Sequence, residues 1–273
     1  MLSWRIAAAA VAGERHVAEA RPCEDAFATR LVSGPGGPWL IVAVSDGAGS
    51  AECARAGSAC AVAAFVDAAA SGLATGAAVD ADRVRAWIGA ARTEIAADAA
   101  AASRPMRDHA ATLLAAIVGA RTAAFVQIGD GAIVVAGDEP GSWAWMFEPH
   151  KGEYANETSF LSDADAAEKA SVAVLDQVPA ELALFTDGLE NLLIEVLPVR
   201  RVVAEFFDRM LPPVRGVGNA GLDTALSDHL AHYLASAPIA ARSDDDRTLV
   251  LATRLDARRT VAADGGNLQC AAP

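Results

Sequence analysis

Apolar and polar residues alternate in short blocks along the first part of this chain. Three apolar runs of strand length, bounded by turn-forming residues, come first: residues 4–11, 26–32 and 39–44. Two longer segments follow, in which apolar residues recur at the spacing of one helical face: residues 49–70 and 80–102. The pattern therefore predicts strands followed by two helices.

The middle of the chain returns to short apolar runs separated by turns. These runs predict six further strands, at residues 112–118, 123–128, 132–136, 142–147, 171–175 and 182–185. Two helices and a closing strand complete the pattern, at residues 198–211, 222–234 and 248–253. Because the connections between the middle strands are of hairpin length, we expect antiparallel sheets rather than alternating strand and helix units. Helices grouped outside these strands would cover the sheets.

Length and composition favour one domain. The chain has 273 residues, of which 53% are hydrophobic, and no segment rich in Pro, Ser or Gly divides it. Apolar periodicity is lost near the C-terminus. We therefore predict one domain over residues 1–255, followed by a loose tail over residues 256–273.

The charge and the cysteine content limit the classes of binding partner and the cellular location that we expect. The net charge is −13, from 22 basic and 35 acidic residues, and this argues against nucleic-acid binding, which needs a basic face. The four cysteines are irregularly spaced, as is typical of free thiols in a reducing compartment. The N-terminal apolar stretch is short, and no run approaches the length of a membrane span. We expect a cytoplasmic protein with no membrane partner.

Five acidic segments carry the candidate chemistry. Each presents an acidic residue beside an apolar run: residues 23–27, 43–49, 126–134, 183–190 and 244–250. In three of them, Asp46, Asp130 and Asp187 precede a Gly, so the chain turns just past a carboxylate. Carboxylates gathered at strand ends would repel one another and raise one another's pKa unless a cation shared the site. Oxygen ligands of this kind select Mg²⁺ or Mn²⁺ over Zn²⁺, although any single Asp-Gly pair is also explained as a turn.

The order of these segments resembles that of the metal-dependent protein phosphatases of type 2C, and more closely a bacterial branch of them. Five motifs carry the resemblance: Glu24-Asp25, Asp46-Gly47-Ala48-Gly49, Gly129-Asp130-Gly131, Thr186-Asp187-Gly188-Leu189 and Asp245-Asp246-Arg247-Thr248. The branch-like pieces are PCEDAF, SDGAGSA and EYANETSFL. The resemblance covers residues 13–253 and implies an α+β fold. This fold is a four-layer αββα sandwich, in which two packed antiparallel β-sheets are flanked by α-helices and the metal cleft lies at one end.

The resemblance also implies a ligand set. Asp46 resembles the carboxylate that bridges two metal ions, and the carbonyl of Gly47 resembles the adjoining backbone ligand. Asp187 and Asp245 resemble the remaining carboxylate ligands of one of these ions. Asp130 resembles the acid that, with Asp187, supports a third and weaker ion in bacterial relatives. The implied cofactor is Mn²⁺ or Mg²⁺.

Residues around this set have less certain counterparts in the family. Glu24 and Asp25 resemble partners that hold metal-bound waters. Asp246 stands where many relatives have Asn, and it is interpreted as a residue behind the ligands. The residue after the first Asp-Gly pair is a His in many eukaryotic relatives, where it acts as general acid, but here it is Ala48. The proton for the leaving group must then come from water or from another side chain.

Phosphate recognition is the least certain correspondence. The phosphate-binding Arg of many relatives falls at Ala20 of this chain, so Arg21 and His16 are the available substitutes. His16 could also supply the proton that Ala48 cannot. A polar segment at residues 148–161 lies where relatives have a flap near the cleft. Its candidate substrate contacts, which could instead only satisfy loop backbone, are Glu153, Asn156 and Thr158.

Together these features predict a serine/threonine phosphoprotein phosphatase that hydrolyses phosphate monoesters. The implied reaction is direct in-line attack by a metal-bridging water or hydroxide, supported by Asp46, Asp187 and Asp245, without a phosphoenzyme. The expected partners are a phosphorylated protein substrate and a cognate kinase. Two alternatives stay open: a small-molecule phosphoesterase on the same metal centre, and a catalytically silent module of the same fold that binds phosphoproteins.

Overall fold

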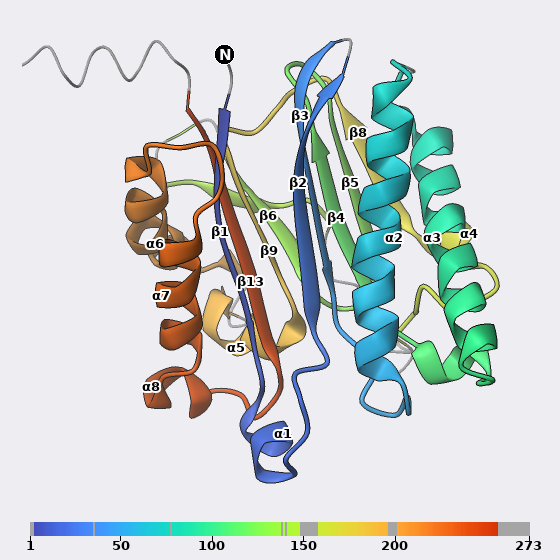
Figure 1. Cartoon of the computed structure of the whole chain (residues 1–273). Coiled ribbons are helices and arrows are strands. Elements are labelled where there is room, and N and C mark those ends of the chain that lie inside the picture. The colour runs from blue at the N-terminus through green and yellow to red at the C-terminus, as the bar shows by residue number, and fades with distance from the viewer. Residues whose placement is uncertain are drawn as a thin grey trace, which may run out of the picture.

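The computed structural model describes residues 3–34, 36–76, 78–137, 139, 141–147, 158–195 and 201–255. Two β-sheets pack face to face, and helices cover the outer face of each sheet (Figure 1). This arrangement confirms the expected α+β fold, with layers in the order helix, sheet, sheet, helix. The segment 256–273 lies outside the described residues, so the boundary at residue 255 stays a prediction.

The first sheet contains five strands, and every neighbouring pair is antiparallel. Its order is β2 (Ala26–Gly34), β3 (Gly37–Ser45), β4 (Leu113–Val118), β5 (Ala123–Ile128) and β8 (Ser171–Leu175). Its outer face is covered by α2 (Ala54–Ala74) and α3 (Ala81–Ala101). The Asp80 carboxylate accepts a hydrogen bond from the Arg83 backbone N–H at the start of α3 (2.8 Å), as a helix cap does. Phe65, Trp87 and Ile117 lie in the resulting core.

In the described part of the chain, the second sheet contains six strands. Its order is β12 (Gly221–Leu222), β1 (Ser3–Val11), β13 (Arg247–Leu255), β9 (Glu181–Phe185), β6 (Ala132–Ala136) and β7 (Trp143–Trp145). Strands β1 and β12 pair in parallel, whereas we expected antiparallel pairs only. The two-residue β12 enters from the helical layer rather than through a hairpin, so the connection-length argument does not apply to it.

Three helices cover the outer face of the second sheet: α6 (Ala204–Gly216), α7 (Thr224–Leu234) and α8 (Ala237–Ala240). Strand β1 contributes to the cores on both sides of this sheet. Trp4, Ile6 and Ala8 face the other sheet, whereas Ala7 and Ala9 face the helices. Successive side chains of a strand point to opposite faces, so one apolar run supplies both cores.

Short elements fill the connections. They are α1 (Glu14–Ala18), α4 (Ala166–Lys169), α5 (Glu190–Leu193), the pair β10 (Ile194–Glu195) and β11 (Arg201–Val202), and 3-10 turns at Met106–His109 and Asp187–Leu189. Helix α1 was not expected, because five residues are too few to show helical periodicity. Helix α2 begins five residues later than expected, because the preceding residues form a loop in which the Cys53 N–H donates to the Asp108 carbonyl (2.8 Å). Helix α6 begins at Ala204, while residues 198–200 lie outside the described residues.

Helix α2 is long and apolar enough to cross a membrane by length and composition, and it is the one such helix within the described ranges. This corrects the expectation that no run reaches such a length. The helix packs against β2, β3 and α3, and Figure 1 shows it beside α3 on the outer side of the first sheet. This packing places its apolar face, which includes Phe65 and Val66, in the core.

The candidate acids gather at one end of the sandwich. Val11 at the end of β1 pairs with Arg247 at the start of β13, and Ala26 at the start of β2 pairs with Ser45 at the end of β3. Helix α1 lies at this same end (Figure 1). The loops that carry the acidic motifs therefore meet there.

Candidate metal centre

Asp46 follows β3, and Thr112 fixes its backbone. The Asp46 N–H donates to Thr112 Oγ1 (2.9 Å), and the Thr112 N–H donates to the Asp46 carbonyl (2.8 Å). Gly47 forms an isolated bridge with Ala111. A Cβ on Gly47 would lie 2.7 Å from the Ala54 carbonyl oxygen, so this close approach requires glycine.

Asp130 and Asp187 reach the same place from two other connections. Asp130 lies in the β5–β6 turn after Gly129, which adopts φ +102° and packs against Thr112. Asp187 follows β9, and a Cβ on the next residue, Gly188, would lie 1.9 Å from the carbonyl oxygen of Asp246. One carboxylate oxygen each of Asp46, Asp130 and Asp187 lie within 4.8 Å of one another. Three segments that are distant in sequence thus bring their carboxylates together in one group of three acids.

Asp25 supports this group from the buried side. Its Oδ2 accepts hydrogen bonds from the hydroxyls of Thr186 and Thr248, both at 2.8 Å. Its Oδ1 is buried and has no hydrogen-bond partner among the described residues, and its charge raises the pKa of Asp46. A buried carboxylate oxygen without a donor is costly unless a cation lies nearby.

The carboxylates border a polar hollow of about 210 Å³. Its lining residues are Arg15, His16, Asp46, Gly47, Ala48, Gly49, Ser50, Thr112, Asp130, Thr158, Phe160, Asp187, Asp245 and Asp246. At its rim the Asp245 carboxylate lies 3.3 Å from Arg15 Nη2. The hollow therefore combines several negative charges with one arginine.

The electrostatics of this hollow favour a bound cation. Burial raises the pKa of Asp46 to about 10, and the charges of Asp25, Asp187, Asp245 and Asp130 add to this rise. Burial also raises the pKa of Asp25 to about 7 and that of Asp187 to about 6. A divalent ion would remove the repulsion that these values express. The oxygen-only donors fit hard ions such as Mn²⁺ and Mg²⁺.

In chelator, we expect the melting temperature to fall as pH rises from about 5 to about 9. Unfolded carboxyls ionise near pH 3.9, whereas in the folded protein Asp187, Asp25 and Asp46 keep their protons until about pH 6, about pH 7 and about pH 10. The folded state therefore binds more protons in this window, and its stability decreases by up to about 1.4 kcal/mol per pH unit for each proton. Differential scanning fluorimetry measures the slope. Added Mn²⁺ should flatten it, whereas a flat profile in chelator would contradict this electrostatic account.

The structure turns several expected site residues away from the hollow. Glu24 does not line it, because its Oε1 accepts from Arg21 Nη2 (2.6 Å) and its Oε2 faces His16 Nε2 (3.7 Å). Arg21 also binds Glu19 (3.3 Å) and does not line the hollow, so its expected phosphate contact stays a prediction that this geometry does not support. His16 does line the hollow, and its Nδ1 donates to Asp246 (2.8 Å). Its Nε2 is buried, has no hydrogen-bond partner among the described residues, and faces the Glu24 carboxylate at 3.7 Å.

The structure describes one of the three candidate substrate contacts that were expected in the flap segment. Thr158 lines the hollow, but its hydroxyl donates to Asp130 Oδ2 (3.0 Å), so its observed partner is a carboxylate of the centre. The chain is anchored three residues after Thr158, because the Leu161 side chain is buried and the Leu161 N–H donates to the Ala111 carbonyl (2.8 Å). Glu153 and Asn156 lie outside the described residues.

Sequence reasoning missed two kinds of functional residue. The first is Arg15, which precedes His16 on a helix that had no pattern to reveal it. The second is the set of threonines, since Thr112 holds Asp46 and both Thr186 and Thr248 hold Asp25. A signal for the threonines existed, because two of them belong to the late acidic motifs. Their role as hydroxyl donors to a buried carboxylate depends on tertiary contacts.

Fold and site together define an αββα sandwich with an oxygen-only divalent-metal centre at one end. The family profile described as protein phosphatase 2C matches residues 12–234. The chain belongs to the protein phosphatase 2C family, which confirms the resemblance found in the sequence.

Known proteins agree with this assignment. The chain is 32% identical over 254 residues to serine/threonine-protein phosphatase 3 of Escherichia coli (strain K12), covering 92% of this chain and 98% of that protein. The catalytic domain of the serine/threonine protein phosphatase PstP in complex with two manganese ions is 19% identical, with a TM-score of 0.59 and coverage of 94% and 100%. Stp1 from Staphylococcus aureus is 15% identical, with a TM-score of 0.57 and coverage of 93% and 95%. These two structures share the fold.

Proposed function

We propose that this protein is a metal-dependent serine/threonine phosphoprotein phosphatase. The observation that carries the proposal is the group of Asp46, Asp130 and Asp187, whose ligand oxygens lie within 4.8 Å of one another at the end of a 2C-type sandwich. Family membership and the Escherichia coli relative support the activity. The two-manganese complex of PstP supports Mn²⁺ or Mg²⁺ as the cofactor.

The chain's own residues prepare the hollow for phosphate ester hydrolysis. Asp46 and Asp187 would hold the ions, with Asp130 and Asp245 at the edges. Two such ions supply positive charge that activates a coordinated water and neutralises phosphoryl oxygens. Thr112 keeps the Asp46 backbone in place through two hydrogen bonds, so the Asp46 carboxylate is preorganised before substrate arrives.

Arg15 is the residue that we assign to phosphate binding. Its guanidinium lines the hollow, is about half exposed (48%), and lies 3.3 Å from Asp245. A guanidinium can bind two phosphate oxygens with parallel hydrogen bonds. An exposed ion pair such as Arg15–Asp245 is weak, so Arg15 can turn to a phosphoryl group at little cost.

Protonation of the leaving alkoxide has no dedicated side chain in the described part of the hollow. Ala48 occupies the place after Asp46-Gly47, and both ring nitrogens of His16 face carboxylates. We therefore infer that water in the open hollow supplies this proton. Protonation of the leaving group would then contribute little to any fall in activity at high pH.

The activity is tested on purified protein after chelation. Mn²⁺ or Mg²⁺ should restore release of phosphate from phosphoserine and phosphothreonine peptides, with much slower release from sugar and nucleotide phosphates. Preference for the small phosphates would favour the small-molecule phosphoesterase. Tight binding of a phosphopeptide without turnover would favour the silent binding module.

Asp130→Asn should lower the maximal rate severalfold while the tighter metal sites still fill. Asp130 is exposed, whereas Asp46 and Asp187 are half-buried, and an exposed carboxylate binds a cation more weakly because water screens it. Its Oδ2 is also engaged by the Thr158 hydroxyl. Isothermal titration with Mn²⁺ should lose the weakest class of sites. Loss of the tightest class instead would make Asp130 a principal ligand.

We also infer a cytoplasmic location and a cognate kinase. Cys23, Cys53 and Cys60 are free thiols, which supports a reducing compartment. A phosphoprotein substrate requires an enzyme that phosphorylates it. Cell fractionation tests the location, and recovery of the protein with membranes after a salt wash would contradict it.

A further inference from the structure

The Asp246 carboxylate joins separate segments of the chain beside the hollow. It is buried, with 4% of its surface exposed. Its Oδ1 accepts hydrogen bonds from the Gly13 N–H (2.7 Å) and from His16 Nδ1 (2.8 Å), and its Oδ2 accepts from the Glu24 N–H (2.5 Å). One side chain at the start of β13 therefore holds the loop before α1, α1 itself and the acid-pair segment.

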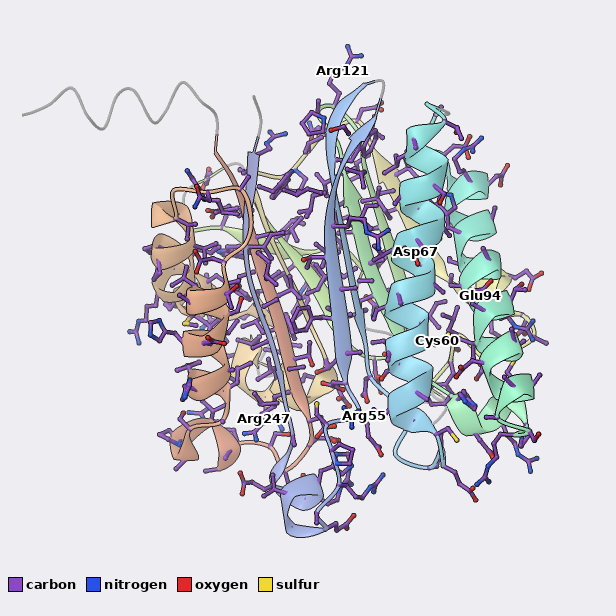
Figure 2. All side chains as sticks on the ribbon, in the orientation of Figure 1. Arg55, Cys60, Asp67, Glu94, Arg121 and Arg247 are labelled. Carbon is purple, nitrogen blue, oxygen red and sulfur yellow. The ribbon has the colours of Figure 1, made fainter. Side chains whose placement is uncertain are left out.

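Further contacts hold the loop before α1 against the residues around Asp246. The Arg15 N–H donates to the Asp244 carbonyl (3.2 Å), and the Nη2 of buried Arg247 donates to the Ala12 carbonyl (3.1 Å). Figure 2 labels Arg247 at this end of the sandwich, beside the start of β13. A Cβ on Gly13 would lie 2.3 Å from the Asp244 carbonyl oxygen. The loop is therefore seated by contact as well as by hydrogen bonds.

Helix α1 needs these contacts to keep its place. It has five residues, whereas an isolated helix needs at least about 12 to be stable in water. His16 is its one buried residue among five described ones, and Val17 is 60% exposed. The hydrogen bond from His16 to Asp246 is therefore the buried side-chain anchor of the helix that carries Arg15, whereas the contacts of Glu14 and Arg15 involve exposed side chains.

Aspartate suits this position better than asparagine. The hydrogen bonds that the carboxylate accepts from Gly13, His16 and Glu24 use both of its oxygens. An asparagine offers one acceptor oxygen and an NH₂ group, so at least one buried donor would lose its partner. A buried donor without a partner destabilises the arrangement that contains it.

We propose that Asp246 is a positioning residue for phosphate binding, because it holds α1 where the Arg15 guanidinium reaches the hollow. The link is short: Asp246 fixes Gly13 and His16, and Arg15 lies between them in sequence. The inference rests on the proposed function, in which Arg15 binds the phosphoryl group. Asp246 also lines the hollow, but both of its carboxylate oxygens are engaged by Gly13, His16 and Glu24, so its role is assigned to positioning.

The test uses Asp246→Asn in the full chain loaded with Mn²⁺, with inorganic phosphate as the probe. We expect its dissociation constant to rise about tenfold by calorimetry, the size of one charge-assisted hydrogen bond. KM for a phosphopeptide should rise in parallel while kcat changes little. In Arg15→Gln, the further change Asp246→Asn should add little, because both act through one guanidinium.

Asp244→Asn is the matched control. Asp244 is an exposed neighbour that contributes its backbone carbonyl to the loop, so this variant should bind phosphate like the parent. If Asp246→Asn does not fold, His16→Ala removes one of the three donors and should shift phosphate binding in the same direction. The folded state of each variant is checked by its melting temperature.

Two results would overturn the inference. One is an additive effect of Asp246→Asn and Arg15→Gln on phosphate binding. The other is weaker Mn²⁺ binding with unchanged phosphate affinity, which would mean that Asp246 acts through its neighbour Asp245. Absence of phosphatase activity in the parent protein would instead count against the proposed function, and phosphate calorimetry would still test the positioning role.

Discussion

Asp46→Asn should abolish phosphatase activity and, in chelator, raise the melting temperature. The activity should fall by at least about a thousandfold, because the several kcal/mol that metal ions contribute to the transition state depend on this central carboxylate. The stability should rise because burial and four neighbouring acids raise the pKa of Asp46 to about 10. Asn removes that repulsion without changing the side-chain shape. Phosphopeptide turnover and thermal melting in chelator measure the two effects.

The sign of the stability effect follows from proton binding. The Asp46 pKa is higher in the folded than in the unfolded protein, so its contribution to stability declines as pH rises toward about 10. The Asp46→Asn variant has no such decline, so the difference in melting temperature between this variant and the parent should grow with pH. Asp67→Asn, an exposed acid on α2 that Figure 2 labels far from the centre, is the control and should show neither effect. Near-parent turnover by Asp46→Asn would refute the assignment.

Arg15→Gln should lower kcat/KM for a phosphopeptide about tenfold to a hundredfold. The loss corresponds to charge-assisted hydrogen bonds of about 1.5–3 kcal/mol between the guanidinium and the phosphoryl oxygens. Because the Arg15 side chain pairs with Asp245 and makes no hydrogen bond to Asp46, Asp130 or Asp187 in the described part of the chain, Mn²⁺ affinity should change little. Steady-state kinetics and Mn²⁺ calorimetry separate phosphate binding from metal binding.

Two arginines provide matched controls for this variant. Arg21→Gln tests the earlier expectation directly, and it should change kcat/KM little because Arg21 pairs with Glu24 and Glu19 outside the hollow. Arg121→Gln removes an exposed charge at the opposite end of the sandwich (Figure 2). If Arg21→Gln has the larger effect, the guanidinium must move on substrate binding and the present assignment of Arg15 is wrong.

Local sequence patterns were sufficient for the longer elements and indicated the candidate acids. The apolar run of β1 and the helical spacing in α3 are properties of neighbouring residues, so the sequence indicated these elements within a few positions. The same holds for the Asp-Gly turns, because a strand that ends before Asp46, Asp130 or Asp187 places each carboxylate just past the end of that strand. Composition indicated oxygen ligands and hence a hard metal ion.

Tertiary structure decided which of the neighbouring charges face the metal centre. Ala20 adopts a left-handed conformation (φ +55°), which turns the chain before Arg21 in a way that no spacing argument predicts. Arg21 then meets Glu24, while Arg15 reaches the hollow from α1. The hydrogen bonds from Gly13 and His16 to Asp246 join residues more than 200 positions apart. Strand ends are determined by local sequence, but the direction of a side chain in a loop depends on partners that only the folded chain brings together.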